Sequence, residues 1–164
     1  MPEFKINTER TICFLLRDTQ KDKKILLGFK KEGQGKGNYN GFGGKLKPGE
    51  TAEQAAVREL REETTLLVEE KNLEKRATID FHFPYKPEWN QKVHVYFVKT
   101  WKGEPCETEE MRPEWFSRNN IPYEKMWDSD KYWLPLLLAG KQINAEFTWK
   151  KDNKTVDGYS IKHI

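Results

Sequence analysis

The chain has 164 residues, enough for one domain with a sizeable core and too few for two ordinary domains. Six Trp, nine Phe and six Tyr are too many aromatic residues for a disordered chain. The 29 basic and 26 acidic residues leave a net charge of +3, which does not favour a protein that binds a nucleic acid polymer but is compatible with a small polyanionic partner.

Cysteine usage and hydropathy bear on the compartment of the protein. Cys13 and Cys106 provide neither a disulfide framework nor the spacing of a zinc site, which indicates two reduced thiols. No apolar run approaches ~18 residues, and no signal-peptide pattern is visible. These features predict a soluble, cytoplasmic protein without a membrane partner.

The first third of the chain predicts a β-hairpin followed by glycine-rich turns. Residues 11–17 and 25–29 are apolar runs of strand length with a charged turn between them. Residues 32–37 form a glycine-rich loop without the Walker pattern, so a mobile loop is favoured over a phosphate cradle. In residues 38–44, glycines permit a close approach between backbones.

A helix is predicted from Thr51 to residue 64 or 65. The Pro48-Gly49 dipeptide breaks the preceding element, and Thr51 with Gln54 forms a capping box. No glycine marks the C-terminal end of this helix, although glycine is common at that position.

Glutamates gather on one side of this helix. At about 100° per residue, Glu59 and Glu63 lie within roughly 40° of each other, with Glu62 on the adjacent side. Arg58 precedes Glu62 by one turn and can pair with it. Such a helix is usually a solvated surface when it occurs alone. Its like charges destabilise it unless a cation neutralises them, and carboxylate oxygens favour a hard divalent ion such as magnesium, manganese or calcium.

The remaining chain predicts more strands and one further helix. Residues 76–83 alternate polar and apolar side chains, which places Phe81 and Phe83 on one face. His82 and His94 lack metal-ligand spacing and are interpreted as polar-face residues. The other expected elements are a strand-like run at 66–68, loops at 84–90 and 103–113, strands at 92–98 and 115–116, a helical turn at 121–123, a helix at 128–139 and a hairpin of 143–150 with 155–161. The whole chain, 1–164, is therefore predicted to be one α+β domain with a mixed sheet and two main helices.

The stretch 44–66 resembles the Nudix signature, which reads Gly, five residues, Glu, seven residues, Arg-Glu-apolar-x-Glu-Glu, one residue, Gly and an apolar residue. The positions in register are Gly44, Glu50, Arg58, Glu59, Leu60, Glu62, Glu63 and Leu66. Only the final glycine differs, and Thr65 stands in its place. The segments 40–45, 110–116, 121–122, 126–127 and 132–138 are also similar to the animal MutT homologues, a subfamily that hydrolyses oxidised purine nucleoside triphosphates. The resemblance implies the Nudix fold, a mixed sheet sandwiched by two helices.

The resemblance also implies a Mg²⁺ site, in which Mn²⁺ could substitute. Hydrolysis of a triphosphate needs water delivered to phosphorus and neutralised charge on the phosphate oxygens. By position, the ligands are the Gly43 carbonyl, Glu59, Glu63 and, from a later loop, Glu110, with support from Glu62. Glu63 is expected to matter most, since it would both bind metal and activate water, while Arg58 would orient the glutamates. For Glu50, a role in the site and a role beside the helix-start amides remain alternatives.

A base site is implied in the same way. An oxidised purine needs an aromatic surface together with donors and acceptors that read its edge. The residues implied are Asn40 for hydrogen bonds to the base, Trp127 for stacking, Phe81 and Phe83 for the pocket wall, and Thr11 and Lys30 near the sugar and phosphates. Taken alone, Trp127 is more readily interpreted as a core residue, and its place in the segment Met-Trp-x-x-Asp shifts the interpretation toward the site.

Two positions depart from the subfamily. Where the family pocket presents two adjacent aspartates to the purine edge, this chain has Ser129-Asp130, so one carboxyl group is lost. Asp130 can still accept a hydrogen bond or, when protonated, donate one. Gln34 also replaces an aromatic residue of the loop lid. Both departures put the acceptance of both oxidised guanine and oxidised adenine nucleotides in question.

The leading hypothesis is a monomeric, Mg²⁺-dependent pyrophosphohydrolase that converts oxidised purine nucleoside triphosphates to monophosphate and pyrophosphate. It would sanitise the nucleotide pool and so serve DNA repair. One alternative is a Nudix hydrolase of another modified nucleotide. Another is a nucleotide-binding protein without catalysis, for which Thr65 is the only support.

Overall fold

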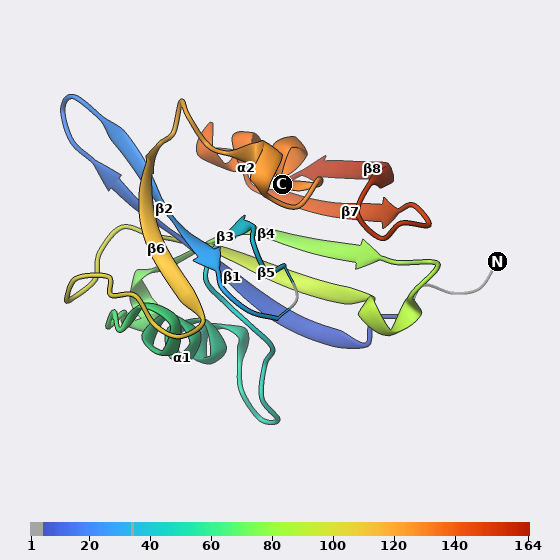
Figure 1. Cartoon of the computed structure of the whole chain (residues 1–164), viewed down its shortest axis with the longest axis horizontal. Helices are drawn as coiled ribbons and strands as arrows, with labels where there is room; N and C mark the ends of the chain where they lie inside the picture. Colours follow the sequence, from blue (N-terminus) through green and yellow to red (C-terminus); the bar gives the residue numbers. More distant parts are fainter. Residues whose placement is uncertain (1–4, 34) are drawn as a thin grey trace.

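One mixed sheet with a helix on each face organises the computed structural model, which describes residues 5–33 and 35–164 (Figure 1). Its strands are β1 (Thr8–Asp18), β2 (Lys23–Lys30), β3 (Tyr39–Asn40), β4 (Leu73–His82), β5 (Gln91–Val98), β6 (Met111–Ser117), β7 (Ile143–Trp149) and β8 (Val156–His163). The helices are α1 (Ala52–Thr64) and α2 (Asp130–Leu138), and 3-10 turns lie at Glu70–Asn72, Pro87–Trp89 and Tyr123–Lys125. No helix in the described ranges is long and apolar enough to cross a membrane.

The strand order is β3-β2-β1-β5-β4-β7-β8, and β6 pairs with β2. Strands β1 and β5 run parallel, as do β4 and β7, whereas the other pairs are antiparallel. The predicted hairpins are therefore confirmed as β1–β2 and β7–β8, and the sheet is mixed as expected.

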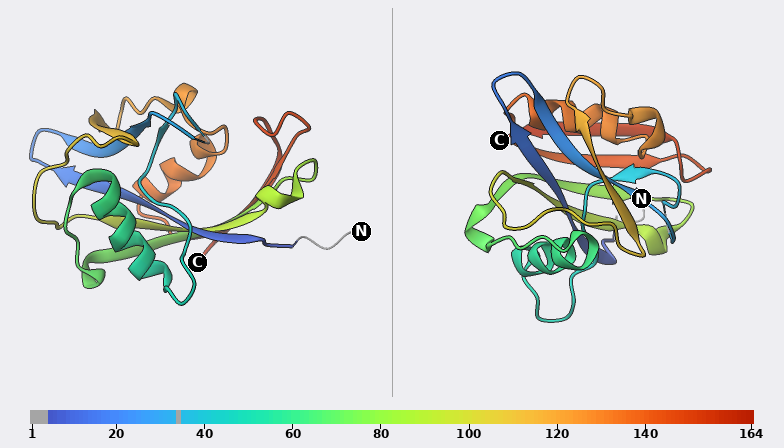
Figure 2. Two further views of the ribbon diagram at one scale, coloured as in Figure 1. Left: turned by 60° about the horizontal axis from the view of Figure 1, so that its bottom comes forward. Right: turned by 60° about the vertical axis from the view of Figure 1, so that its left-hand side comes forward.

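Alternation along the strands gives the sheet two apolar faces, each covered by one helix. On β1, Cys13 and Leu15 belong to the same buried cluster as Leu60 of α1. The intervening Phe14 packs instead in the cluster that contains Trp133 of α2, and the two rings lie 6.0 Å apart. Figure 2 shows the helices on opposite sides of the sheet. The predicted α/β/α arrangement is confirmed.

Helix α1 begins at a capping box and ends at a residue in the left-handed conformation. The Thr51 hydroxyl accepts from Gln54 N at 3.1 Å, and Gln54 Oε1 accepts from Thr51 N at 2.9 Å, so the predicted capping box is confirmed. At the other end Thr65 adopts the left-handed conformation, with φ 68° and ψ 1°. A β-branched residue in this conformation costs roughly 1 to 2 kcal/mol, which glycine would avoid.

Several predicted elements and boundaries were wrong, including the start of the strand expected at 76–83, which begins at Leu73. Residues 66–68 form no strand, since Leu67 makes only an isolated bridge to Lys102. Strand β6 begins at Met111, inside the expected loop 103–113, because Pro113 is tolerated in a strand that lies at a sheet edge. Helix α2 starts two residues later than expected, and the short strand β3 was not predicted.

Candidate active site

The glycine turn before α1 lies directly against β1. Thr11 N donates to Gly44 O at 2.9 Å, and Phe42 N donates to Cys13 O at 2.9 Å. A Cβ atom on Gly43 would lie 1.8 Å from Thr11 O, so no other residue fits there without moving the backbone. The absence of a side chain at Gly43 is thus what lets the turn approach the strand.

Glu63, near the end of α1, points back into this turn. Gly43 N donates to its Oε1 at 2.7 Å, and the residue is only 4% exposed. Burial is the main reason that the pKa of Glu63 is raised to about 8. The negative charges of Glu59 and Glu110 also raise it, whereas the Gly43 hydrogen bond and the charge of Lys30 lower it. A nearby cation would remove this cost and hold the carboxylate ionised.

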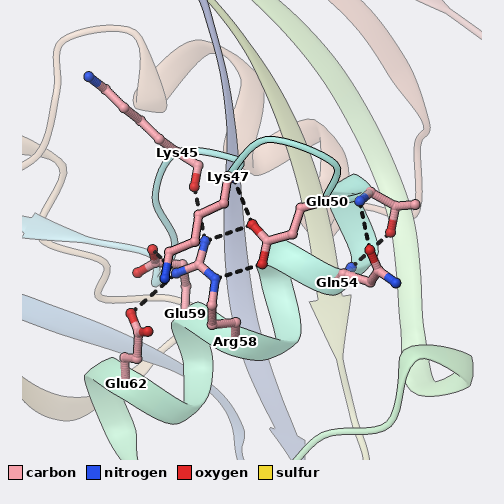
Figure 3. Close-up of polar contacts among 8 residues, drawn as sticks. Lys45, Lys47, Glu50, Gln54, Arg58, Glu59 and Glu62 are labelled. Carbon is pink, nitrogen blue, oxygen red and sulfur yellow. Dashed lines mark hydrogen bonds and ion pairs between the residues drawn. The ribbon is translucent and has the colours of Figure 1, made fainter.

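Arg58 gathers the other acidic groups of α1 (Figure 3). Its Nε and Nη2 donate to the two oxygens of Glu50 at 2.7 and 2.9 Å, and its Nη1 donates to Glu59 Oε1 at 2.8 Å. A weaker bond of 3.3 Å reaches Glu62 Oε2, whose side chain is half exposed. The guanidinium therefore holds Glu50 in a forked ion pair and fixes Glu59 beside Glu63.

Glu50 has a structural partner on each side. One oxygen accepts from Lys47 N at 2.8 Å, and both oxygens accept from Arg58. The hydrogen bonds from Arg58 and then from Lys47 N lower the pKa of Glu50 to about 2. Of the two alternatives for Glu50, the geometry favours support of the site through Arg58.

The loop that carries Glu110 is tied to the C-terminal end of α1. Thr108 Oγ1 donates to the backbone carbonyl of Glu63 at 3.2 Å, and Cys106 N donates to Thr64 O at 2.9 Å. On the other side, Lys31 N donates to the Glu110 carbonyl at 2.9 Å. These bonds bring a residue from position 110 next to a helix that ends at position 64, close enough for its charge to act on Glu63.

The donor set at this end of the site fits a hard divalent ion. Glu59, Glu63 and Glu110 offer carboxylate oxygens only, and two of these charges act on the buried third. Within residues 5–33 and 35–164, however, no three acidic, His or Cys side chains already converge as a ligand group. His94 contacts Lys75 Nζ at 2.6 Å and Glu9 at 3.8 Å, which agrees with its interpretation as a polar-face residue.

A cavity of about 310 Å³ extends from Glu63 across the sheet toward α2. All eight residues predicted to bind substrate line it: Thr11, Lys30, Asn40, Phe81, Phe83, Trp127, Ser129 and Asp130. Of the predicted catalytic and metal-binding residues, Gly43 and Glu63 line it as well. Arg58, Glu59, Glu62 and Glu110 are not among the lining residues; Arg58 and Glu59 lie directly behind the glycine turn.

Aromatic rings form the wall of the cavity over β4 and β7, which lie two and three strands away from β1 and the glycine turn beside it. The Phe83 and Trp149 rings are stacked, with centroids 5.4 Å apart and an interplanar angle of 9°. Trp127 meets Trp149 edge-on at 5.8 Å, and Phe81 lies 6.1 Å from Trp149. Such a wall provides the flat apolar surface on which a purine can rest.

Ser129 and Asp130 place one carboxyl group in this aromatic environment. Ser129 is fully buried, and its hydroxyl donates to Asp130 Oδ1 at 3.3 Å. Burial raises the pKa of Asp130 to about 7, which the hydrogen bond from the Ser129 hydroxyl offsets only in part. Near neutral pH, Asp130 can therefore either donate a hydrogen bond or accept one.

Several cavity residues were missed from the sequence, among them Arg10, Gln91 and Trp149. Trp149 follows the period-2 pattern of the last hairpin, a signal that places it in the core but does not identify a cavity. Gln91 and Arg10 lie on neighbouring strands β5 and β1, whose pairing no local pattern shows. Gln34, predicted to alter the loop lid, lies outside the described residues.

Comparison with known proteins agrees with this geometry. The NUDIX domain model matches residues 7–137. The chain is 43% identical over 141 residues to the oxidized purine nucleoside triphosphate hydrolase of Mus musculus, covering 86% of this chain and 88% of that protein. It is 43% identical over 134 residues to the protein of the same name from Danio rerio, covering 82% and 84%.

The fold has a close counterpart among solved structures. The MutT protein of Bacillus halodurans superposes with a TM-score of 0.79 at 21% identity, covering 94% of this chain and 97% of that one. At this identity the likeness concerns the fold, whereas the domain match and the animal relatives concern the family. On these grounds, the glycine turn and the glutamate-rich helix α1 are a Nudix box, and the chain belongs to the Nudix hydrolase family.

Proposed function

We propose that the whole chain, residues 1–164, acts as one Nudix domain that hydrolyses oxidised purine nucleoside triphosphates to the monophosphate and pyrophosphate. The observation that carries this proposal is a single cavity with a buried carboxylate, Glu63, at one end and an aromatic wall with Asp130 at the other. The activity for which the mouse and zebrafish relatives are named supports the same substrate class.

The end of the cavity at Glu63, here called the phosphate end, carries the negative charges that would bind the metal ion. Glu59, Glu63 and Glu110, together with the Gly43 carbonyl, would hold Mg²⁺, or Mn²⁺ in its place. When bound, this ion neutralises phosphate oxygens and lowers the pKa of water. Glu63 would then be ionised and, held by Gly43 N, could take the proton of the attacking water.

Three further residues would support this chemistry. Arg58 keeps Glu59 oriented through the 2.8 Å bond, and Glu50 keeps Arg58 in place through its forked ion pair. Glu62, half exposed and weakly bonded to Arg58, would add negative charge at the rim of the site. Lys30, whose charge acts on Glu63, would meet the phosphates.

Recognition of the base would take place against the aromatic wall. Phe81, Phe83 and Trp127 would enclose the purine ring, while Asn40 and Asp130 would bond to its polar edge. Thr11 would lie near the sugar. Because Ser129 stands where a second carboxyl group is usual, we expect Ser129→Asp to widen the range of accepted bases. An unchanged substrate profile in that variant would show that Ser129 does not face the base.

The biological role and the location of the protein are proposed on the same grounds. A hydrolase of free oxidised nucleotides would keep damaged precursors out of DNA, acting as a cytoplasmic monomer on small molecules and not on nucleic acid polymers. Cys13 is buried, Cys106 is exposed, and neither forms a disulfide.

The proposal is tested by turnover of oxidised and plain dGTP and dATP with Mg²⁺, in water enriched in ¹⁸O, with the products identified. We expect monophosphate and pyrophosphate from the oxidised purines, and no turnover when EDTA removes the metal. Release of inorganic phosphate instead would contradict the assigned bond. Binding without turnover of any nucleotide would show a non-catalytic nucleotide-binding protein.

A further inference from the structure

Arg10 lies in the cavity and has no role in the assignments above. On β1 it lies on the same face as Ile12 and Phe14, and all three residues line the cavity. Its neighbour across the parallel pairing with β5 is Val93, another lining residue. Arg10 and Lys30 are the only cationic residues that line this cavity in the described part of the chain.

The hydrogen-bonding capacity of Arg10 is not used inside the protein. No hydrogen bond or ion pair joins its guanidinium to another side chain of the described ranges, and no aromatic ring there stacks on it. Other arginines are engaged: Arg58 binds three glutamates, and Arg118 binds Asp18. A half-buried guanidinium with five donors and no acceptor is costly, and burial accordingly lowers the pKa of Arg10.

The position of Arg10 is at the phosphate end of the cavity. The next residue, Thr11, bonds through its N–H to Gly44 O, and Arg10 itself forms an isolated bridge with Lys45. Glu59 packs on Gly44 so closely that a Cβ atom there would lie 2.6 Å from Glu59 Oε1. The side chain of Arg10 shares the face of β1 that carries Ile12 and Phe14, and the charge of Glu59 reaches it there, so its guanidinium lies within electrostatic range of a proposed metal ligand.

We propose that Arg10 binds phosphate oxygens of the nucleotide substrate and increases the preference of the site for a long phosphate chain. The inference rests on the proposed function of this site and assigns a further binding residue to it. A guanidinium offers two parallel N–H donors that match two phosphate oxygens, which an ammonium group such as that of Lys30 cannot do. Arg10 thus supplies the directional contact, and Lys30 supplies a point charge.

The alternative is a structural role, in which the charge of Arg10 holds Glu59 in place and Arg10 does not contact the substrate. The two roles differ in what they do to binding. If Arg10 contacts phosphate, its removal should weaken the binding of each ligand in proportion to the number of phosphates that the ligand carries. If Arg10 only positions Glu59, its removal should change metal binding and affect every ligand alike.

The experiment is calorimetric binding of deoxyguanosine, dGMP, dGDP and α,β-methylene-dGTP with Mg²⁺ to the wild type and to Arg10→Gln. The methylene bridge replaces the bond expected to break, so binding is measured without turnover. We expect Arg10→Gln to weaken the triphosphate analogue by about 10-fold to 100-fold, the range of charge-assisted hydrogen bonds, and to leave deoxyguanosine unchanged. Arg10→Lys should recover part of the loss.

Arg17→Gln is the matched control, because Arg17 lies at the other end of β1 and packs on Trp115 at 4.3 Å. It should bind all four ligands as the wild type does. An equal loss for all four ligands in Arg10→Gln, or no loss for the triphosphate analogue, would overturn the inference. The proposed function is tested separately by turnover. If no nucleotide is hydrolysed, the proposed function is wrong, even if Arg10→Gln weakens the binding of the triphosphate analogue as expected.

Discussion

The two ends of the cavity are built in different ways. At the phosphate end, Gly43, Gly44, Glu59 and Glu63 come from a stretch of 21 residues held together by direct hydrogen bonds and by the capped helix α1. At the base end, the residues proposed to meet the base and the aromatic wall come from four separate segments: Asn40 in β3, Phe81 and Phe83 at the end of β4, residues 127–130 at the start of α2, and Trp149 in β7.

Under the proposed function, this difference would separate reaction type from substrate choice. The phosphate end is polar, and its carboxylates are coupled by charge. The base end is aromatic, with one buried carboxyl group whose pKa is about 7. Changes at the first should alter the rate for every nucleotide, whereas changes at the second should alter which nucleotide is accepted.

The largest expected effect is at Glu63. Glu63→Gln should lower kcat by more than about 100-fold for every substrate, since the loss of a ligand should exceed the 10- to 100-fold effect of outer contacts. Gln can still accept from Gly43 N, so the fold should persist. Because the pKa of Glu63 is about 8 against a usual 4.5, its buried charge costs stability as pH rises through this range. The metal-free variant should therefore be more stable than the wild type at pH 8.

Steady-state kinetics and thermal unfolding in EDTA check this prediction, with the exposed Glu70→Gln as control. A Glu63→Gln enzyme that retains full activity would remove Glu63 from the reaction. A substrate-dependent loss would contradict the separation of the two ends.

At the base end, Asp130→Asn removes the ionisable carboxyl group, so that its contribution to the pH dependence of stability can be measured. The pKa of Asp130 is about 7 in the fold against a usual 3.8, so the folded protein keeps a proton that the unfolded chain releases. This stabilisation is complete below pH 3.8 and is lost as pH rises through 7. The free energy of unfolding of the wild type minus that of Asp130→Asn should therefore fall over this range, by on the order of 4 kcal/mol at most.

Denaturant unfolding at several pH values measures this difference. Asp128→Asn is the matched control: although partial burial acts the other way, bonds from Val156 N and Lys131 lower the pKa of Asp128. The free energy of unfolding of the wild type minus that of Asp128→Asn should therefore rise with pH, and it should do so at lower pH than the change expected for Asp130→Asn. A flat profile for Asp130→Asn would show that Asp130 is ionised throughout.

A smaller effect is expected at Thr108, which joins the Glu110 loop to α1. Thr108→Val keeps the shape but loses the bond to the Glu63 carbonyl, at a cost of about 1 kcal/mol in stability. Less precise placement of Glu110 should also lower kcat by roughly 10-fold, the lower range for outer contacts of a metal site. Chemical denaturation and kinetics with the exposed Thr100→Val as control test this, and unchanged kcat would mean that the loop does not need this bond.

The smallest expected effect on activity is at Thr65, the one departure from the Nudix signature. Thr65→Gly relieves the left-handed strain and should stabilise the protein by about 1 kcal/mol, while kcat and KM stay the same. Thermal unfolding and kinetics measure both quantities. If activity rises clearly, the strain at Thr65 reaches the carboxylates, and the helix end is part of the site.

The same comparison explains what the sequence could predict. Spacing within one helix places Glu59 and Glu63 together, and the capping box defines where that helix begins, so the phosphate end follows from local rules. At the base end, only a family resemblance brought Asn40, Trp127 and Asp130 together. Arg10 and Gln91 lie in adjacent strands joined by a parallel pairing, and such long-range contacts leave no local pattern.

The most direct test of the account is the ratio of kcat/KM for 8-oxo-dGTP to kcat/KM for dGTP, measured with Mg²⁺ at neutral pH. Differential contacts of Asn40 and Asp130 with the oxidised edge of the base should make this ratio at least about tenfold, a modest demand for one or two discriminating hydrogen bonds. A ratio close to one would contradict the account, because the base end of the cavity would then not distinguish an oxidised purine from an intact one.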